Sequence, residues 1–147
     1  MKVDIVVGNT EIPKYATPGS AAVDLRAAIK ETIVLHPERT VMIPTALKMA
    51  IPEGCFGLIA PRSGLGARKG IVLSNLVGVI DPSYRGEIMI SLWNRNPFES
   101  REIFVIEPGD KLCQMMFVPF VQVSFNPVDC LDETERGEGG FGSTGRS

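Results

Sequence analysis

Short apolar runs separated by turn-forming residues make up most of this 147-residue chain. The runs recur roughly every 8–12 residues, which is the spacing typical of β-sandwiches and barrels. Only residues 64–69 resemble one or two helical turns. The pattern therefore predicts an all-β protein, a jelly-roll-like β-barrel or sandwich with one short helix. The predicted strands are Val3–Val7, Val23–Ala27, Thr32–Leu35, Thr40–Ile43, Ala46–Ile51, Phe56–Ala60, Ile71–Leu73, Leu76–Ile80, Ile88–Trp93, Glu102–Ile106 and Leu112–Phe125.

One turn segment, 81–87, carries candidate chemistry. Apolar runs at 71–80 and 88–93 flank it, and the residues between them favour turns, so the pattern predicts a β-hairpin. Asp81 and Tyr84 lie at its tip. Two interpretations remain open: a surface turn stabilised by an aspartate, or a ligand pocket in which Asp81 is the reactive group.

The last residues differ in composition from the rest. Five of the final eleven residues are glycine, so we expect an all-β domain over 1–133 and a flexible segment over 134–147. Phe141 lies among these glycines, near Arg136 and two hydroxyl residues. A lid that closes over a ligand could use the ring for stacking and the arginine for an anion; a mobile terminus is the alternative.

Composition excludes several classes of protein. The formal net charge is −2 and no cluster of basic residues is present, which argues against binding a nucleic acid polymer. No apolar run approaches the length of a membrane span, and the N-terminus does not resemble a signal peptide, so we expect a cytoplasmic location. Three widely spaced cysteines and a single histidine, His36, suggest neither a zinc site nor a histidine-based triad.

Three further segments carry polar residues with two interpretations each. Arg62, Ser63 and Gly64 lie where a strand meets the helical turn, which suits an anion site, although Ser63 could instead cap the helix. Asp24 follows a run of small residues at the start of a strand; it is either solvated or salt-bridged, or it lies near a hard metal such as Mg²⁺. Gln114 lies among apolar neighbours and needs hydrogen-bond partners if it is buried.

Together and in this order, five segments resemble the motifs of the dUTPase family, the homotrimeric dUTP nucleotidohydrolases. The resemblance runs from about residue 16 to residue 146, nearly the whole chain. Three departures from the family pattern, Ala22, Lys111 and Cys113, are conservative in size or charge. The five segments are Gly19–Leu25, Pro61–Leu65, Gly78–Gly86, Gly109–Met115 and Arg136–Gly145.

The resemblance implies Mg²⁺-dependent hydrolysis of dUTP to dUMP and pyrophosphate, which limits uracil in DNA and supplies dUMP for dTMP synthesis. It implies that Asp81 activates the attacking water as general base, and that Asp24 reaches Mg²⁺ through water. Tyr84 would lie under the deoxyribose. It further implies a homotrimer whose sites are shared between subunits.

The remaining residues receive binding roles by the same resemblance. Backbone groups of the segment from Asn75 to Met89, including Val79 and Ile80, would recognise the uracil edge. Phosphate oxygens and water would be held by Arg62, Ser63, Gly64 and Gln114. In the tail, Arg136 would contact the terminal phosphate, Phe141 would stack on uracil, and Gly142 and Ser143 would complete the substrate contacts.

Two alternatives differ in chemistry. The dCTP deaminase branch of the same fold changes the base instead of cutting the triphosphate, but it lacks the complete tail motif seen at 136–145. A regulatory protein could keep the fold without catalysis; the presence of Asp81 and of the tail disfavours it.

Overall fold

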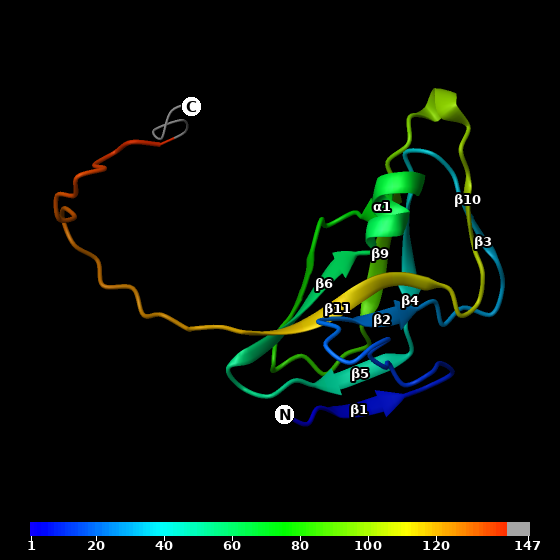
Figure 1. The fold of residues 1–147 in the computed structure, drawn as a ribbon, viewed down its shortest axis with the longest axis horizontal. Coiled ribbons are helices and arrows are strands. Elements are labelled where there is room, and N and C mark those ends of the chain that lie inside the picture. Colours follow the sequence, from blue (N-terminus) through cyan, green and yellow to red (C-terminus); the bar gives the residue numbers. More distant parts are fainter. Residues whose placement is uncertain (141–147) are drawn as a thin grey trace.

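The computed structural model describes residues 1–140 and is almost entirely β-structure, with one seven-residue helix (Figure 1). The predicted all-β class with one short helix is confirmed. Residues 1–140 contain no helix that is long and apolar enough to cross a membrane. The elements are β1 (Asp4–Val7), β2 (Val23–Arg26), β3 (Ile33–Leu35), β4 (Thr40–Pro44), β5 (Leu47–Ala50), β6 (Cys55–Pro61), α1 (Ser63–Lys69), β7 (Ile71–Leu73), β8 (Gly78–Ile80), β9 (Met89–Asn94), the 3-10 turn η1 (Phe98–Ser100), β10 (Phe104–Ile106) and β11 (Lys111–Pro119).

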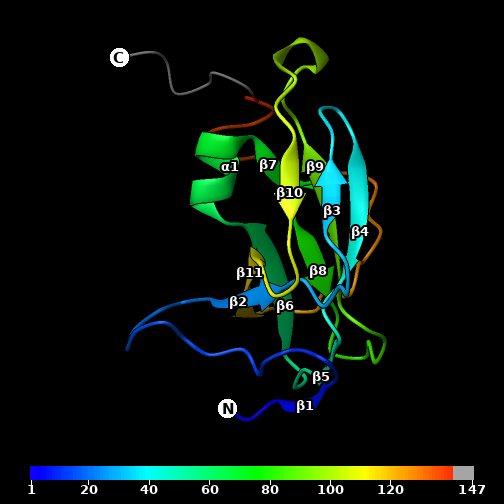
Figure 2. The ribbon, with the colours of Figure 1, turned by 90° about the vertical axis from the view of Figure 1, so that its right-hand side faces the viewer.

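Two antiparallel sheets form the body of the molecule. One has the order β2-β11-β6-β8 and the other the order β4-β9-β7. The pairs β1-β5 and β3-β10 extend the structure at two ends, as Figures 1 and 2 show. Every strand pair is antiparallel, as expected for a sandwich built from short strands.

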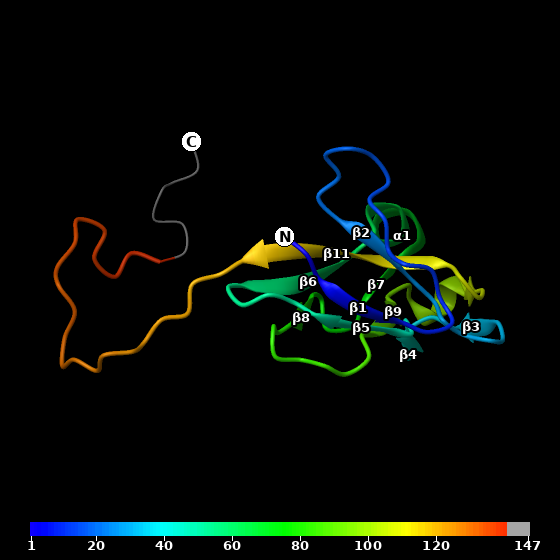
Figure 3. The ribbon, with the colours of Figure 1, turned by 90° about the horizontal axis from the view of Figure 1, so that it is seen from below.

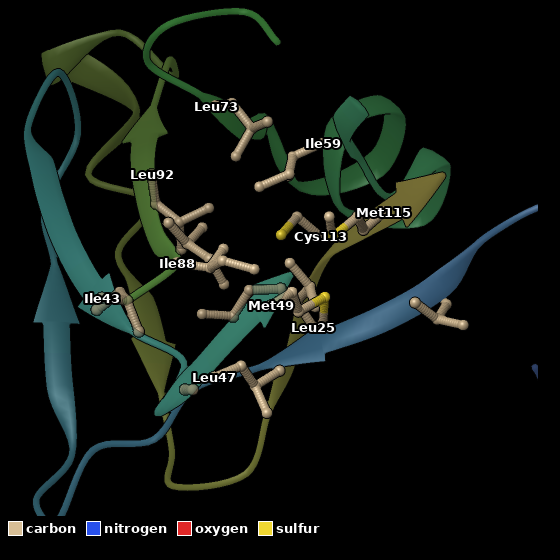
Figure 4. Packing of buried hydrophobic residues seen from close by; sticks show 14 of the residues in the cluster. Leu25, Ile43, Leu47, Met49, Ile59, Leu73, Ile88, Leu92, Cys113 and Met115 are labelled. Carbon is tan, nitrogen blue, oxygen red and sulfur yellow. The ribbon is translucent and has the colours of Figure 1, made fainter. Parts of the chain in front are cut away.

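The core lies between the two larger sheets. Alternate residues of the strands point inward, so that Leu25 and Met115 of one sheet face Ile43 and Leu92 of the other (Figure 4). All four side chains are at most 1 % exposed. Complete burial of such a side chain contributes about 1.5–3 kcal/mol each, and this burial holds the two sheets together.

The short helix ends where its sequence requires. Gly70 adopts a left-handed conformation, with φ of 68°, and its N–H closes the last turn on the carbonyl of Leu65. At the other end the N-cap is Arg62, without a side-chain hydrogen bond. The prediction that Ser63 could cap the helix is therefore wrong, because Ser63 is the first helical residue.

The segment that follows β8 does not close a hairpin. Strand β8 pairs with β6, whereas β9 pairs with β4 on one edge and β7 on the other. Because both edges of β9 are occupied, neither is available to β8, and residues 81–88 cross from one sheet to the other. The hairpin prediction is wrong for this reason; the turn prediction for 81–87 holds.

The predicted last strand is also shorter than expected. β11 ends at Pro119, and residues 120–140 form neither helix nor strand. This segment extends from the body in Figures 1 and 3 and is exposed along its length. Val121 and Phe125 are 86 % and 92 % exposed, so the alternation of apolar residues that predicted a strand finds no partner within residues 1–140.

A buried asparagine connects three parts of the structure. Asn94 is fully buried; its amide nitrogen donates to the carbonyls of Leu35 (3.1 Å) and Glu102 (2.8 Å). Its amide oxygen accepts the N–H of Asn96 at 3.2 Å. Every hydrogen-bonding group of this side chain is therefore used to join β9, β3 and the chain before β10.

We expect Asn94→Ala to lower the free energy of unfolding by about 2–4 kcal/mol, because a buried carbonyl, that of Leu35, and a partly buried one, that of Glu102, lose their donor. Urea denaturation monitored by Trp93 fluorescence measures this change. Asn96→Ala is the matched control, since the Asn96 amide makes a single exposed bond to the Lys69 carbonyl, and it should cost less than about 1 kcal/mol. Equal losses in the two variants would contradict the assigned role of Asn94.

Candidate functional site

The crossing segment 81–88 forms one wall of a pocket of about 240 Å³. Of its six lining residues, five belong to the set that the sequence assigns to base, sugar and water. The sixth, Glu87, was not predicted. The lining residues are Val79, Ile80, Asp81, Tyr84, Glu87 and Met89.

A backbone hydrogen bond and the Arg85 side chain, and not the side chain of Asp81, hold the turn. The Tyr84 N–H donates to the Asp81 carbonyl at 3.1 Å, and the Arg85 guanidinium donates to the carbonyls of Pro82 and Tyr84. Within residues 1–140 the Asp81 carboxylate has no ion pair and accepts no hydrogen bond. An aspartate that stabilised an ordinary turn would accept a neighbouring N–H, so the pocket interpretation is favoured.

A second group of predicted residues meets on the β2-β11-β6 sheet. Asp24 on β2 lies opposite Gln114 on β11. The Asp24 carboxylate pairs with Arg62 Nε at 3.1 Å and with Lys111 Nζ at 2.8 Å. Arg62 also donates from Nη1 to the Lys111 carbonyl at 3.1 Å, and the Gln114 amide donates to the Pro61 carbonyl at 3.0 Å. We call Asp24, Arg62, Lys111 and Gln114 the cationic cluster.

The cationic cluster carries net positive charge at the surface. Two cations surround one carboxylate, and the side chains of Arg62 and Lys111 are 37 % and 38 % exposed. Such a group can accept an anion while Asp24 holds its cations in place. Asp24 is salt-bridged, whereas its predicted role near Mg²⁺ stays a prediction. The amide of Gln114 has a donor bond.

A neighbouring cysteine is chemically quiet. Cys113 is fully buried, and burial, with a smaller effect from the Asp24 carboxylate, raises the pKa of its thiol to about 12. At neutral pH the thiol therefore stays protonated and does not act as a nucleophile. All three cysteines are unpaired.

The sequence of the chain settles which family this architecture represents. The sequence model of the dUTPase family matches residues 8–145. The chain belongs to the dUTPase family. It is 51 % identical over 146 residues to the deoxyuridine 5'-triphosphate nucleotidohydrolase of Tolumonas auensis, covering 98 % of this chain and 94 % of that one. It is 54 % identical over 136 residues to the enzyme of the same name from Sodalis glossinidius, covering 92 % and 87 %.

Solved dUTPase structures show the same fold. A point mutant of the Staphylococcus bacteriophage 80alpha dUTPase, solved with dUpNHpp, superposes with a TM-score of 0.89 at 26 % identity, over 99 % of both chains. A mutant dUTPase from phage phi11 of S. aureus, described for its coordination of a structural Mg(II) ion, has a TM-score of 0.79 at 25 % identity and covers 88 % of this chain and 97 % of that one.

The remaining predicted residues of this dUTPase chain belong to neither group, although Ser63 and Gly64 directly follow Arg62. Ser63 and Gly64 are exposed at the start of α1, and Asn75 is exposed in the loop before β8. Arg136 is exposed in the tail, where its Nε donates to the Gly139 carbonyl at 2.8 Å. Phe141, Gly142 and Ser143 lie outside the described residues. The pocket at Asp81 and the cationic cluster share no residue.

Two contributing residues were missed at the sequence level. Lys111 was noted only as a family departure, although it completes the cationic cluster. Its place two residues after Gly109, at the start of an apolar strand, was the available signal. Glu87 had a comparable signal, as a carboxylate between Gly86 and the buried run that begins at Ile88.

Both carboxylate oxygens of Asp24 are paired with cations, so Asp24 could reach a Mg²⁺ brought by a nucleotide only through metal-bound water. Mg²⁺ is bound through one or two carboxylates together with substrate phosphates and retained waters. Asp24 offers one partly exposed carboxylate beside two cations suited to phosphate. Within residues 1–140 there is no group of three or more His, Cys, Asp or Glu side chains placed to bind a metal.

Proposed function

We propose that this chain hydrolyses dUTP to dUMP and pyrophosphate, with water attacking the α-phosphorus. The observation that carries the mechanism is the Asp81 carboxylate in the wall of a pocket of about 240 Å³, where it has no ion pair or hydrogen bond within residues 1–140. A carboxylate without a competing partner can orient a water molecule and accept its proton. Phosphoryl transfer needs mainly positioning and charge stabilisation, so no covalent nucleophile is required.

Base and sugar are selected by the pocket. Backbone groups along Asn75–Met89, with Val79 and Ile80 in the wall, meet the uracil edge. Cytosine presents the opposite hydrogen-bonding pattern and would leave polar groups unpaired, which is a larger penalty than a misfit of one methyl group. The Tyr84 ring lies where it would meet the deoxyribose and collide with a 2′-hydroxyl.

Phosphates are held by the cationic cluster and the adjacent helix start. Arg62 and Gln114, with Ser63 and Gly64, contact phosphate oxygens and the water. Asp24 would hold Mg²⁺ through metal-bound water; when bound, the ion would neutralise charge on the phosphate oxygens. The side chains of this chain orient the triphosphate and keep Asp24 in place.

A complete site requires more than one copy. The pocket and the cationic cluster share no residue, and the tail extends away from the body. These features support a homotrimer in which one subunit supplies the pocket, a second the cationic cluster, and a third the tail segment 134–147. From that tail, Arg136 contacts the terminal phosphate, Phe141 stacks on the uracil, and Gly142 and Ser143 line the closed site.

The proposed activity has a simple cellular consequence. Removal of dUTP limits the incorporation of uracil into DNA, and dUMP becomes available for dTMP synthesis. Both effects act on the nucleotide pool, so the proposed location is the cytoplasm. No nucleic acid polymer or membrane takes part.

Four nucleotides test the proposal. The protein is incubated with Mg²⁺ and dUTP, dTTP, dCTP or UTP, and pyrophosphate and ammonia are measured. Pyrophosphate from dUTP alone is expected. Ammonia from dCTP would move the chain to the deaminase branch, and no product from any nucleotide would favour a regulatory protein.

Arg62 should not tolerate lysine. Its guanidinium bridges the Asp24 carboxylate and the Lys111 carbonyl through two nitrogens, and a single ammonium cannot reproduce that fork. We expect Arg62→Lys to lower kcat/KM for dUTP by about tenfold or more. Steady-state release of pyrophosphate measures the effect. Arg68→Lys, in the last turn of α1, is the matched control and should keep parental kinetics; equal losses would contradict the assignment.

A further inference from the structure

The unpredicted pocket residue, Glu87, contacts a part of the fold that no motif includes. Its carboxylate Oε1 accepts the backbone N–H of Ala46 at 2.7 Å. Ala46 lies in the turn between β4 and β5 and has a φ of 55°, a conformation that a residue with a side chain rarely adopts. The carboxylate thus satisfies a backbone group in a strained turn, 41 positions away in the sequence.

Two more hydrogen bonds join the same two segments, and a third holds the 45–47 turn itself. The fully buried Thr45 hydroxyl donates to the Ile88 carbonyl at 2.6 Å and accepts the Leu47 N–H at 3.3 Å. The Ile88 N–H donates to the Leu47 carbonyl at 2.9 Å. The Glu87 carboxylate and both backbone groups of Ile88 therefore hold residues 87–88 to residues 45–47. We call this set of contacts the 45–88 clamp.

The clamp determines where Tyr84 lies. The Tyr84 hydroxyl donates to the Glu87 carbonyl at 2.9 Å. The ring also lies directly on Gly86, since a Cβ added there would be only 2.4 Å from the Tyr84 hydroxyl oxygen. The side chain of Tyr84 is thus held against the 86–87 backbone, and the Glu87 carboxylate fixes that backbone to Ala46.

We propose that Glu87 is a positioning residue for sugar selection: by anchoring residues 86–87 to the β4–β5 turn, it holds the Tyr84 ring where it excludes a 2′-hydroxyl. The inference rests on the proposed function. It gives a role to the second carboxylate that lines the pocket, beside Asp81. If the anchor is lost, the ring can move away and a ribonucleotide can enter.

The test compares kcat/KM for dUTP with that for UTP. We expect Glu87→Ala to lower the ratio of the two values by about tenfold, mainly through a gain with UTP. Glu87→Gln keeps an oxygen that can accept the Ala46 N–H and should keep most of the ratio. Binding of dUMP and UMP, measured by calorimetry, gives the same comparison without turnover.

Two further variants separate positioning from general destabilisation. Ile106→Val removes a methylene from a fully buried residue on β10, outside the clamp; it should lower stability and leave the ratio unchanged. Tyr84→Phe keeps the ring but loses its bond to Glu87, and it should shift the ratio as Glu87→Ala does. This second variant decides the question if Glu87→Ala does not fold.

The outcomes distinguish the two proposals. If the parent protein releases no pyrophosphate from dUTP, the proposed function fails and this inference fails with it. If the parent is active and both Glu87→Ala and Tyr84→Phe keep the parental ratio, the inference alone is overturned. A fall in the ratio for Ile106→Val would overturn it as well, because selection would then follow stability.

Discussion

Replacing Asp81 with asparagine should lower the turnover of dUTP by about 10²–10⁴-fold while nucleotide binding stays near the parental level. Asparagine has nearly the same shape and can still orient a water molecule, but its amide cannot accept the proton. Within residues 1–140 the Asp81 carboxylate has no ion pair, so the substitution leaves no partner uncompensated. Unfolding free energy should therefore change by less than about 0.5 kcal/mol.

Single-turnover release of pyrophosphate and calorimetric binding of a non-hydrolysable dUTP analogue separate these two effects. Asp4→Asn, an equivalent change at an exposed position on β1, is the control and should keep parental turnover and parental binding. Parental turnover by Asp81→Asn would refute the assignment of the general base. Loss of binding together with turnover would instead assign Asp81 to substrate attachment.

Deleting residues 134–147 should leave a folded protein with little activity. Residues 134–140 are exposed, and the hydrogen bonds described for them are local, from Gly137 to Thr134 and from Arg136 to Gly139. Their removal exposes no core, so the melting temperature should stay nearly unchanged. Turnover should fall by about 10²-fold or more if the tail is the proposed lid, because Arg136, Phe141 and the exclusion of water are then lost.

Deletion of residues 146–147 alone is the matched control, since it preserves the motif that ends at Gly145. The two truncated proteins are compared by circular dichroism, by sedimentation and by pyrophosphate release. Full activity of the protein that lacks 134–147 would exclude the lid. A change in its sedimentation would show that the tail contributes to assembly as well.

The sequence predicted the individual strands better than their partners. Alternation of apolar residues is a local property, and it located β2, β4 and β6 to within a few residues. Pairing is not local. The connection at 81–88 has the composition of a hairpin, yet β9 is paired on both edges by β4 and β7. The residues between β8 and β9 do not indicate that β4 and β7 occupy both edges of β9.

In the candidate site, too, local features were predicted and contacts between distant segments were not. Motif spacing identified Asp81 and Tyr84, whose chemistry is visible in their own segment, and Asp24 and Arg62, which the sheet brings together. Glu87 escaped notice because its role depends on Ala46, far away in the chain. A backbone donor has no signature in the sequence, so a carboxylate that binds one resembles an ordinary surface glutamate.

Because residues of both larger sheets line the pocket, a ligand bound there would stabilise the whole fold. Val79 and Ile80 come from the sheet that contains β6, whereas Met89 begins β9 in the opposite sheet. A nucleotide bound there, as proposed, would contact both sheets. Each tenfold rise in its concentration above Kd adds about 1.4 kcal/mol to the stability of the folded chain. The stability of the folded chain in the cell would then depend on the concentration of the nucleotides that it binds.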